Sequence, residues 1–362
     1  MLDVIIIGAG PAGAACAYDL AAAGCSVLIL DRYGFPRKKA CAGGITPKAM
    51  HLYPYDISDF VLQVCREVRV RRPGGRVFSV ADAQPLCYMT RRQDLDAHAL
   101  EKAVEAGGRF RRIDRILSLD QDRGGVTLDI LQDGGSMQYR ARYIVGADGA
   151  NSTVRRLAAR GKLPVARCPA LEADVRVDRP GDVPMEFDFS MGIDGYYWIF
   201  PKDDHVSIGI FGARPGVPMN RRLLAAYARQ RLGNDRLEAV KGYPIGVGGG
   251  RASAGRGRVL LAGDAAGFAE PLFGEGIYFA LKSGRLAAGA ILEKGSGSSP
   301  LAMYRGRLRR MILDLQLHRL GAGLLYRFPR LSFHLGSLPS IHTHFSRGYA
   351  RGKTISQIFT SR

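Results

Sequence analysis

Three short glycine-rich segments carry residue types suited to binding a dinucleotide. They are Gly8-Ala9-Gly10-Pro11-Ala12-Gly13 near the start, Gly146-Ala147-Asp148-Gly149 in the middle and Gly263-Asp264-Ala265-Ala266 in the last third. Glycine lets the backbone turn tightly and approach a phosphate, and an acid near such a turn can accept hydrogen bonds from sugar hydroxyls. One segment alone is a weak signal. Three in this order predict a flavoprotein that binds FAD.

The first segment has the spacing of a dinucleotide-binding loop. A buried strand precedes Gly8, a helix begins after Gly10, and Asp31 lies 18 residues beyond Gly13. The free N–H groups and the positive dipole end of the helix favour a pyrophosphate. We expect Asp31 to accept hydrogen bonds from the adenosine ribose. This motif alone does not distinguish FAD from NAD.

The other two segments narrow the cofactor to FAD. Residues 143–155 resemble the second fingerprint of the FAD monooxygenase/reductase superfamily, and residues 258–277 resemble its ribityl-binding motif. Asp148 would tie its loop near the dinucleotide or act only as a helix cap. The resemblance implies that Asp264 bonds the ribitol hydroxyls. A helix opening near Gly276 would direct its N–H groups at the flavin ring, and its partial positive charge would stabilise the anionic reduced form.

Two further segments resemble the geranylgeranyl reductase family. Residues 35–47, which include Cys41, are similar to that family's loop, and Gly195-Tyr196-Tyr197-Trp198-Ile199-Phe200-Pro201 is similar to its aromatic substrate motif. The resemblance covers about residues 1–290. It implies an FAD enzyme that reduces isolated double bonds in isoprenoid chains of lipids, chlorophyll precursors or quinones. Ala42, where the family has glycine, and the long spacing of Gly209 to Gly212 depart from the pattern and leave the substrate open.

The same resemblance implies where the cofactor and the substrate lie. Besides the glycines above, the implied cofactor contacts are Ala12, Asp31, Cys41, Ala42, Gly44, Arg92, Ile116, Asp148, Asp264, Gly276 and Ile277. The implied substrate pocket comprises Tyr196, Trp198, Phe200 and Pro201. Cys41 is the candidate catalytic residue: it could tune the flavin, gate the substrate, donate a proton or simply pack as a small buried side chain. Trp198 could line an isoprenoid tunnel or belong to a sheet core.

The surrounding pattern predicts an α/β fold with strands and helices alternating at both ends. We expect a Rossmann-like FAD-binding domain over residues 1–164 and 251–295, an inserted β-rich substrate domain over 165–250, and a basic helical tail over 296–362. Residues about 65–90 are a candidate contribution to the substrate side. Helices are expected over 11–23, 93–106 and 275–293, and strands over 3–8, 26–30, 126–131, 137–145 and 258–262.

Charge and composition favour an anionic partner. The chain has 52 Lys+Arg and 33 Asp+Glu, a formal net charge of +19. Residues 301–362 hold eleven Lys/Arg and one acid, Asp314. An apolar stripe in this tail, at Leu308, Met311, Ile312, Leu315 and Leu320, would pack on the FAD domain, rest on a membrane surface, or do both. The histidines lack metal-ligand spacing, so we expect no metal site.

The expected location is cytoplasmic, peripherally associated with the membrane. The apolar start reads as a strand rather than a secretory signal, no apolar run of about 18 residues could span a bilayer, and the six cysteines are scattered. We expect a hydrophobic isoprenoid substrate, an anionic membrane surface and no nucleic acid as partners. NAD(P)H or another reduced carrier, which includes an electron-donor protein, would supply electrons. The alternatives are an FAD monooxygenase or halogenase on the same scaffold, and a non-enzymatic nucleic-acid or membrane-binding protein that kept a flavin fold.

Overall fold

A mostly parallel sheet forms the core of the first of two large layers. We describe residues 1–159, 163, 165–293 and 298–360 of a computed structural model, so the predicted boundaries at 164 and 296 lie outside the described residues. The sheet order is β17-β18-β11-β1-β2-β8, with β10 and β9 continuing from β11. The strands are β1 (Leu2–Ile7), β2 (Val27–Asp31), β8 (Arg109–Arg112), β9 (Arg115–Gln121), β10 (Val126–Gln132), β11 (Gly135–Gly146), β17 (Gly255–Arg256) and β18 (Val259–Leu261).

Helices cover this sheet because its central strands are apolar on both faces. Val4 to Ile7 in β1 and Val27 to Leu30 in β2 are buried. Helix α1 (Pro11–Ala22) packs against α3 (Arg92–Glu105) and α6 (Ile277–Leu292), and α4 (Thr153–Ala159) lies near β18. The predicted Rossmann-like architecture is confirmed, and the three predicted helices are found within two residues of their expected ends.

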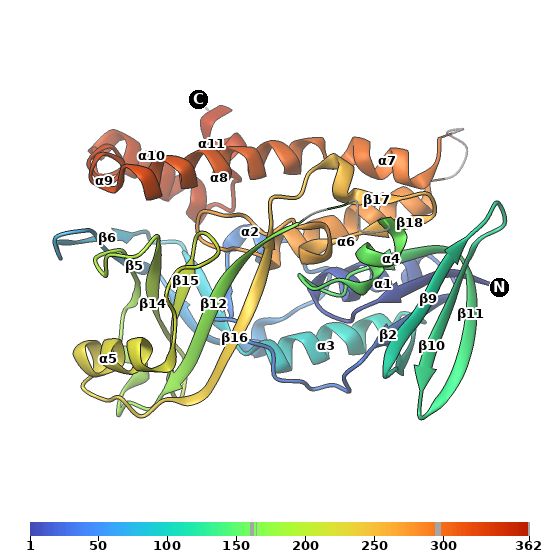
Figure 1. Cartoon of the computed structure of the whole chain (residues 1–362). Helices are drawn as coiled ribbons and strands as arrows, with labels where there is room; N and C mark the ends of the chain where they lie inside the picture. Colours follow the sequence, from blue (N-terminus) through green and yellow to red (C-terminus); the bar gives the residue numbers. More distant parts are fainter. Residues whose placement is uncertain (160–162, 164, 294–297, 361–362) are drawn as a thin grey trace.

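A second, seven-stranded sheet stands beside the first, in the order β16-β12-β15-β14-β13-β5-β6 (Figure 1). Its strands are β5 (Glu67–Arg71), β6 (Val77–Ala81), β12 (Ala166–Val175), β13 (Met185–Asp188), β14 (Gly195–Pro201), β15 (Val206–Gly212) and β16 (Glu238–Val247). Two strands from before residue 90 therefore join five from the predicted substrate domain. One face is covered by α5 (Arg221–Leu232), which is capped by the Asn220 side chain and ends at Gly233 in the left-handed conformation.

A small three-stranded sheet connects the two large layers. It contains β3 (Gly44–Ile45), β4 (Val61–Cys65) and β7 (Cys87–Thr90), with α2 (Pro47–Met50) following β3. Because β3 extends the loop at Cys41, this sheet holds the loop between the two large sheets.

The carboxyl-terminal helices run along one side of the molecule (Figure 1). They are α7 (Pro300–Arg307), α8 (Arg309–Arg327), α9 (Pro329–Gly336), α10 (Pro339–Ala350) and α11 (Ile355–Thr360). The predicted apolar stripe divides along its length. Leu308, Met311, Ile312 and Leu315 are buried in the main core, whereas Leu320 is 71% exposed. The first part of the stripe thus packs on the nucleotide-binding layer and the second part does not.

Candidate functional site

The three glycine-rich segments meet at the carboxyl ends of adjacent strands. They follow β1, β11 and β18, which lie side by side in the sheet. The Gly8 N–H donates to the Leu30 carbonyl at 2.7 Å, Ala147 donates to Ile7 at 2.7 Å, and Ala262 donates to Gly146 at 2.9 Å. In open α/β sheets this edge, where the strand order reverses, is where dinucleotides bind.

Close packing explains the glycines of the first segment. Gly8 has a φ of +100°, and a Cβ there would lie 2.4 Å from the Ala147 carbonyl oxygen. A Cβ on Gly13 would lie 1.8 Å from the Gly8 carbonyl oxygen, so Gly13 allows α1 to contact the loop directly. No side chain caps the start of α1, and its first N–H groups are left for a ligand. The Asp31 carboxylate accepts from the backbone N–H of Ala9 at 2.8 Å, which fixes it beside the loop.

The second segment is held by its own acid. The Asp148 carboxylate accepts from the Ser152 hydroxyl at 2.5 Å and from the N–H groups of Thr153 at 2.7 Å and Val154 at 3.1 Å. Asp148 therefore caps α4. Arg155 on that helix donates to the Ala265 carbonyl at 2.7 Å, and this bond ties the second segment to the third.

The third segment places an acid beside a second helix start. Asp264 accepts from the Gly246 N–H at 3.3 Å, and burial raises the pKa of its carboxyl. A Cβ on Gly276 would lie 3.4 Å from Asp264 Oδ1, so these two residues face the same space. Helix α6 begins at Ile277 without a side-chain cap. Its N-terminus adds a second set of N–H donors at the same edge of the sheet.

One cavity of about 1370 Å³ connects these features with the second sheet. Most of the residues predicted for cofactor and substrate line it: Gly8, Gly10, Ala12, Asp31, Cys41, Ala42, Gly44, Arg92, Ile116, Asp148, Tyr196, Trp198, Phe200, Asp264, Gly276 and Ile277. Gly13 and Pro201 are not on its wall. Gly13 packs behind the loop, and Pro201 points to the opposite face of β14 because side chains alternate along a strand.

The aromatic motif forms the apolar wall of the cavity. Tyr196, Trp198 and Phe200 face the cavity, whereas Tyr197 and Ile199 pack toward α5. Gly209 lies opposite Trp198 in β15, and a Cβ there would lie 2.0 Å from the indole ring. The wall is extended by Phe187 and Phe189, whose rings stand 5.2 Å and 5.4 Å from that of Tyr196. Sequence inspection missed these two residues, although both precede the motif in an apolar, alternating segment.

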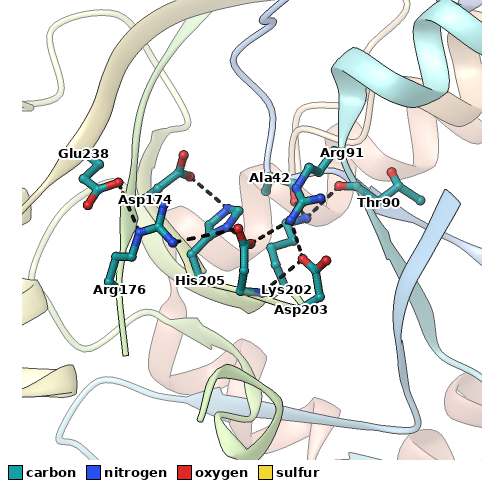
Figure 2. Close-up of polar contacts among 10 residues, drawn as sticks. Ala42, Thr90, Arg91, Asp174, Arg176, Lys202, Asp203, His205 and Glu238 are labelled. Carbon is teal, nitrogen blue, oxygen red and sulfur yellow. Dashed lines mark hydrogen bonds and ion pairs between the residues drawn. The ribbon is translucent and has the colours of Figure 1, made fainter. Parts of the chain in front are cut away.

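The loop at Cys41 is fixed by a lysine from the opposite sheet (Figure 2). Lys202 Nζ donates to the carbonyl oxygens of Ala42 at 2.5 Å and Thr90 at 2.9 Å, and its burial lowers its pKa. A Cβ on Gly43 would lie 2.1 Å from the Thr90 carbonyl oxygen, so glycine is required beside it. Cys41 Sγ accepts from the Gly43 N–H at 3.4 Å.

A charged network surrounds Lys202 at the turn between β14 and β15. Arg91 contacts Asp203 at 2.5 Å and Asp204 at 2.7 Å, and His205 lies between Asp204 and Asp174 (Figure 2). Burial lowers the pKa of His205, but hydrogen bonds and charge from the two carboxylates outweigh it and raise the pKa above its ordinary value. These ion pairs join the second sheet to the start of α3.

Two ionisable groups on the cavity wall have pKa values shifted toward neutrality. Burial raises the pKa of Glu172 to about 7, although a hydrogen bond from the Cys41 backbone opposes the shift. Burial lowers the pKa of Lys39, whose Nζ lies over the Tyr243 ring, to about 7. Glu172 was not predicted. Because side chains alternate along β12, Glu172 lies on the other face of the strand from Leu171. Only the fold shows that the face with Glu172 borders a cavity rather than solvent.

Arg92 forms an ion pair with an acid of its own helix. Its guanidinium donates to both oxygens of Asp96, at 2.9 Å and 2.8 Å, from within helix α3. Burial lowers the pKa of Arg92, but Asp96 and the neighbouring Cys41 raise it well above its ordinary value. Its charge is therefore permanent, and it lies on the cavity wall next to the Cys41 loop.

These features fit FAD in particular. Two helix starts without side-chain caps, a glycine cradle with no room for side chains and the Asp31 and Asp264 carboxylates all border one cavity. Asp31 and the first cradle suit the adenosine and pyrophosphate, and Asp264 with the start of α6 suits the ribitol and the ring. The fold and the site define an FAD-dependent oxidoreductase.

Comparison with known proteins gives the family. Residues 1–185 match the FAD binding domain family. The chain is 33% identical to geranylgeranyl diphosphate reductase of Rhodobacter capsulatus, over 84% of this chain and 78% of that protein. It is 31% identical to digeranylgeranylglycerophospholipid reductase 2 of Methanopyrus kandleri, over 84% of this chain and 81% of that protein. The chain belongs to the geranylgeranyl reductase family of FAD-dependent oxidoreductases.

A solved structure shares the fold over nearly the whole chain. A geranylgeranyl bacteriochlorophyll reductase-like protein from Thermoplasma acidophilum aligns with a TM-score of 0.82 at 20% identity, covering 99% of this chain and 94% of that one. The shared fold includes the carboxyl-terminal helices, beyond the part of the sequence in which we recognised a family resemblance. Among the described residues, no helix combines the length and apolar character needed to cross a bilayer.

Proposed function

We propose that this protein is an FAD-dependent reductase of isoprenoid carbon–carbon double bonds, acting on the prenyl chain of a lipid, quinone or pigment precursor. The observation that carries this proposal is the continuity of the cavity. Its wall runs from the glycine cradle past Cys41 and Trp198 to Phe333 and Phe345 on the carboxyl-terminal helices. A long, aromatic, apolar space suits an extended prenyl chain with one double bond held near the flavin.

The names of the relatives support the same substrate class. Two are reductases of geranylgeranyl groups, and a further relative, 30% identical, is named menaquinone reductase. These substrates have an isoprenoid chain in common and differ in the polar group attached to it.

The roles of the chain's own residues follow from the site. Bound reduced FAD would supply the hydride equivalent for one alkene carbon. Trp198, Phe200 and Tyr196 orient the chain and exclude water. The Glu172 carboxyl holds a proton up to about neutral pH, on the cavity wall beside the Cys41 backbone, and we assign it the proton for the other alkene carbon. Solvent then reprotonates Glu172.

The electron donor is part of the proposal. We propose that NAD(P)H or a reduced carrier protein restores the reduced flavin between turnovers. Such a donor would bind transiently, since the sequence contains one strand–glycine-loop–helix unit with an acid 18 residues beyond it, and FAD uses that unit.

A single-turnover experiment tests the reaction. The holoprotein is reduced chemically without oxygen and mixed with a geranylgeranyl phospholipid. We expect flavin reoxidation together with a gain of two hydrogens per double bond by mass spectrometry. If the flavin stays reduced with prenyl substrates, but reacts rapidly with oxygen and oxygenates or halogenates an aromatic compound, the monooxygenase or halogenase alternative replaces our proposal.

A further inference from the structure

The outer face of helices α8 to α10 is unusually apolar for a surface. Its exposed large side chains are Leu320 at 71%, Leu324 at 44%, Phe328 at 51%, Leu331 at 50%, Leu335 at 39% and Leu338 at 38%. We name these six residues, with the exposed Arg319, Arg327 and Arg330, the docking face. Leu320 and Leu324 are four residues apart on α8, as Leu331 and Leu335 are on α9, so each pair shares one helix face. Large apolar side chains exposed together on neighbouring helices are typical of an interaction site.

The charge of this region identifies the partner. Among residues 301–362 the one acid, Asp314, is buried and accepts from the Ser356 N–H at 2.9 Å. The exposed charges on the docking face are therefore arginines, set among leucine and phenylalanine side chains. This composition complements an anionic lipid surface, where cations meet headgroups and apolar side chains enter the acyl boundary.

The same helices form the far wall of the cavity. Gly321 and Leu325 of α8 line it one residue away from the exposed Leu320 and Leu324. Helix α9 contributes Phe333, which packs against Phe189 with ring centroids 5.2 Å apart. Ile341 of α10 both lines the cavity and is 38% exposed, so the cavity reaches the surface beside the docking face.

We propose that the docking face binds an anionic lipid bilayer, and that the cavity opens into that bilayer between α8, α9 and α10. A prenyl chain then passes from the acyl region to the flavin end without crossing water. The proposal that this face binds a bilayer depends only on its exposed side chains. The proposed role of the opening rests on the reductase function.

Vesicle co-sedimentation of the full-length holoprotein tests the docking face. We expect binding to phosphatidylcholine vesicles containing phosphatidylglycerol, and much weaker binding to phosphatidylcholine alone. Changing Arg319, Arg327 and Arg330 to Gln should weaken binding by about fivefold per arginine at low salt, on the order of a hundredfold together. Changing Leu324, Phe328 and Leu331 to Gln should abolish the binding that persists at high salt, because apolar insertion is not screened.

Matched controls lie on β8, at the edge of the nucleotide-binding sheet. Arg109, Arg111 and Arg112 are exposed on β8, and their change to Gln should leave binding unchanged. Binding that is equal for wild type and both docking-face variants, or absent from anionic vesicles, overturns the proposal. A dimer in solution that is lost in the apolar variant, without any vesicle binding, would assign the face to a second copy of the chain. Unchanged flavin absorbance and circular dichroism establish that the variants are folded.

A second measurement addresses the opening. Gly336 lines the cavity, and a Cβ there would meet no atom within 4 Å, so a side chain can start from this position and the ring of Gly336→Trp would narrow the passage. We expect at least a tenfold loss of reduction of vesicle-borne prenyl lipid, with chemical reduction of the flavin unchanged. Unaltered turnover in this variant would refute the proposal that the prenyl chain enters through this opening. Absence of turnover in the wild type would instead refute the reductase function, and it would leave the vesicle-binding result standing.

Discussion

Asp264 offers the sharpest test of the cofactor site. Its carboxylate is buried beside the start of α6 and accepts from one backbone donor, the Gly246 N–H at 3.3 Å. Burial raises its pKa, which means that the ionised carboxylate is destabilised in the protein without FAD. Ribitol hydroxyls would supply the missing donors. Asp264→Ala should therefore weaken FAD binding far more than it weakens the fold.

The size of the effect follows from the bonds involved. A hydrogen bond to a charged group contributes about 1.5–3 kcal/mol, which corresponds to a rise in the FAD dissociation constant of about ten- to a hundredfold. For the free protein, the loss of the Gly246 partner and the removal of a buried carboxylate act in opposite directions, so the free energy of unfolding should change little.

Titration of the apoprotein with FAD measures the first quantity, and denaturant unfolding of the apoprotein measures the second. Asp148→Ala is the matched control. Asp148 also lines the cavity but caps α4, so this change should cost about 0.5–2 kcal/mol of stability and affect FAD affinity less. An Asp264→Ala protein that binds FAD within twofold of wild type would refute our placement of the ribitol site.

Three further predictions concern the second sheet and its turn between β14 and β15. Gly209→Ala should lower the free energy of unfolding by about 1–3 kcal/mol or more, because its Cβ would overlap the Trp198 ring. As a control, Gly323→Ala on the exposed side of α8 should raise the free energy of unfolding by about 0.4–1 kcal/mol. Chemical denaturation of the two variants and the wild type measures both effects. His205 has a raised pKa, so its ion pairs stabilise the fold below about pH 6.5 and this contribution is lost as the pH rises through the folded-state pKa; His205→Gln should flatten that part of the stability profile, and an unchanged profile would contradict the assignment. The single-turnover rate of alkene reduction should fall as the pH rises through about 7, and Glu172→Gln should lower the rate and remove that pH dependence while FAD affinity stays constant.

The geometry of the first glycine loop was predictable because its requirements are local. Gly8 has a φ of +100°, Gly13 packs against the Gly8 carbonyl within one strand–loop–helix unit, and Asp31 ends the next strand of the same unit. The helix boundaries were predictable for the same reason, since apolar periodicity and glycine stops act over a few residues.

The role of Asp148 shows where local reasoning stops short. The same residues suited a contact near the dinucleotide or a helix cap, and the contacts with Ser152, Thr153 and Val154, which show the cap, depend on the fold. The contacts of Glu172 and Lys202 could not be predicted from the sequence, for a different reason. Each lies in or beside a strand, and its contact is with a loop more than 100 residues earlier in the chain.

In the carboxyl-terminal tail, too, the sequence pattern did not show which side chains are buried. An apolar stripe with flanking arginines is equally suited to a core contact and to a lipid surface, and only the fold shows which apolar side chains of α8 are buried and which are exposed. Near its start the stripe meets the nucleotide-binding layer, and Met311 and Leu315 are buried there. Beyond His318 the helix passes over the cavity, so its inner face is occupied by Gly321 and Leu325 while Leu320 and Leu324 face outward. The spacing accounts for this difference, because Leu320 lies five residues beyond Leu315 and therefore on another face of the helix, whereas Ala322 continues the buried face. The inner face of α8 runs from the packed nucleotide-binding layer to the cavity wall, so the exposed Leu320 and Leu324 lie on the outside of a helix whose inside borders the space proposed for a prenyl chain.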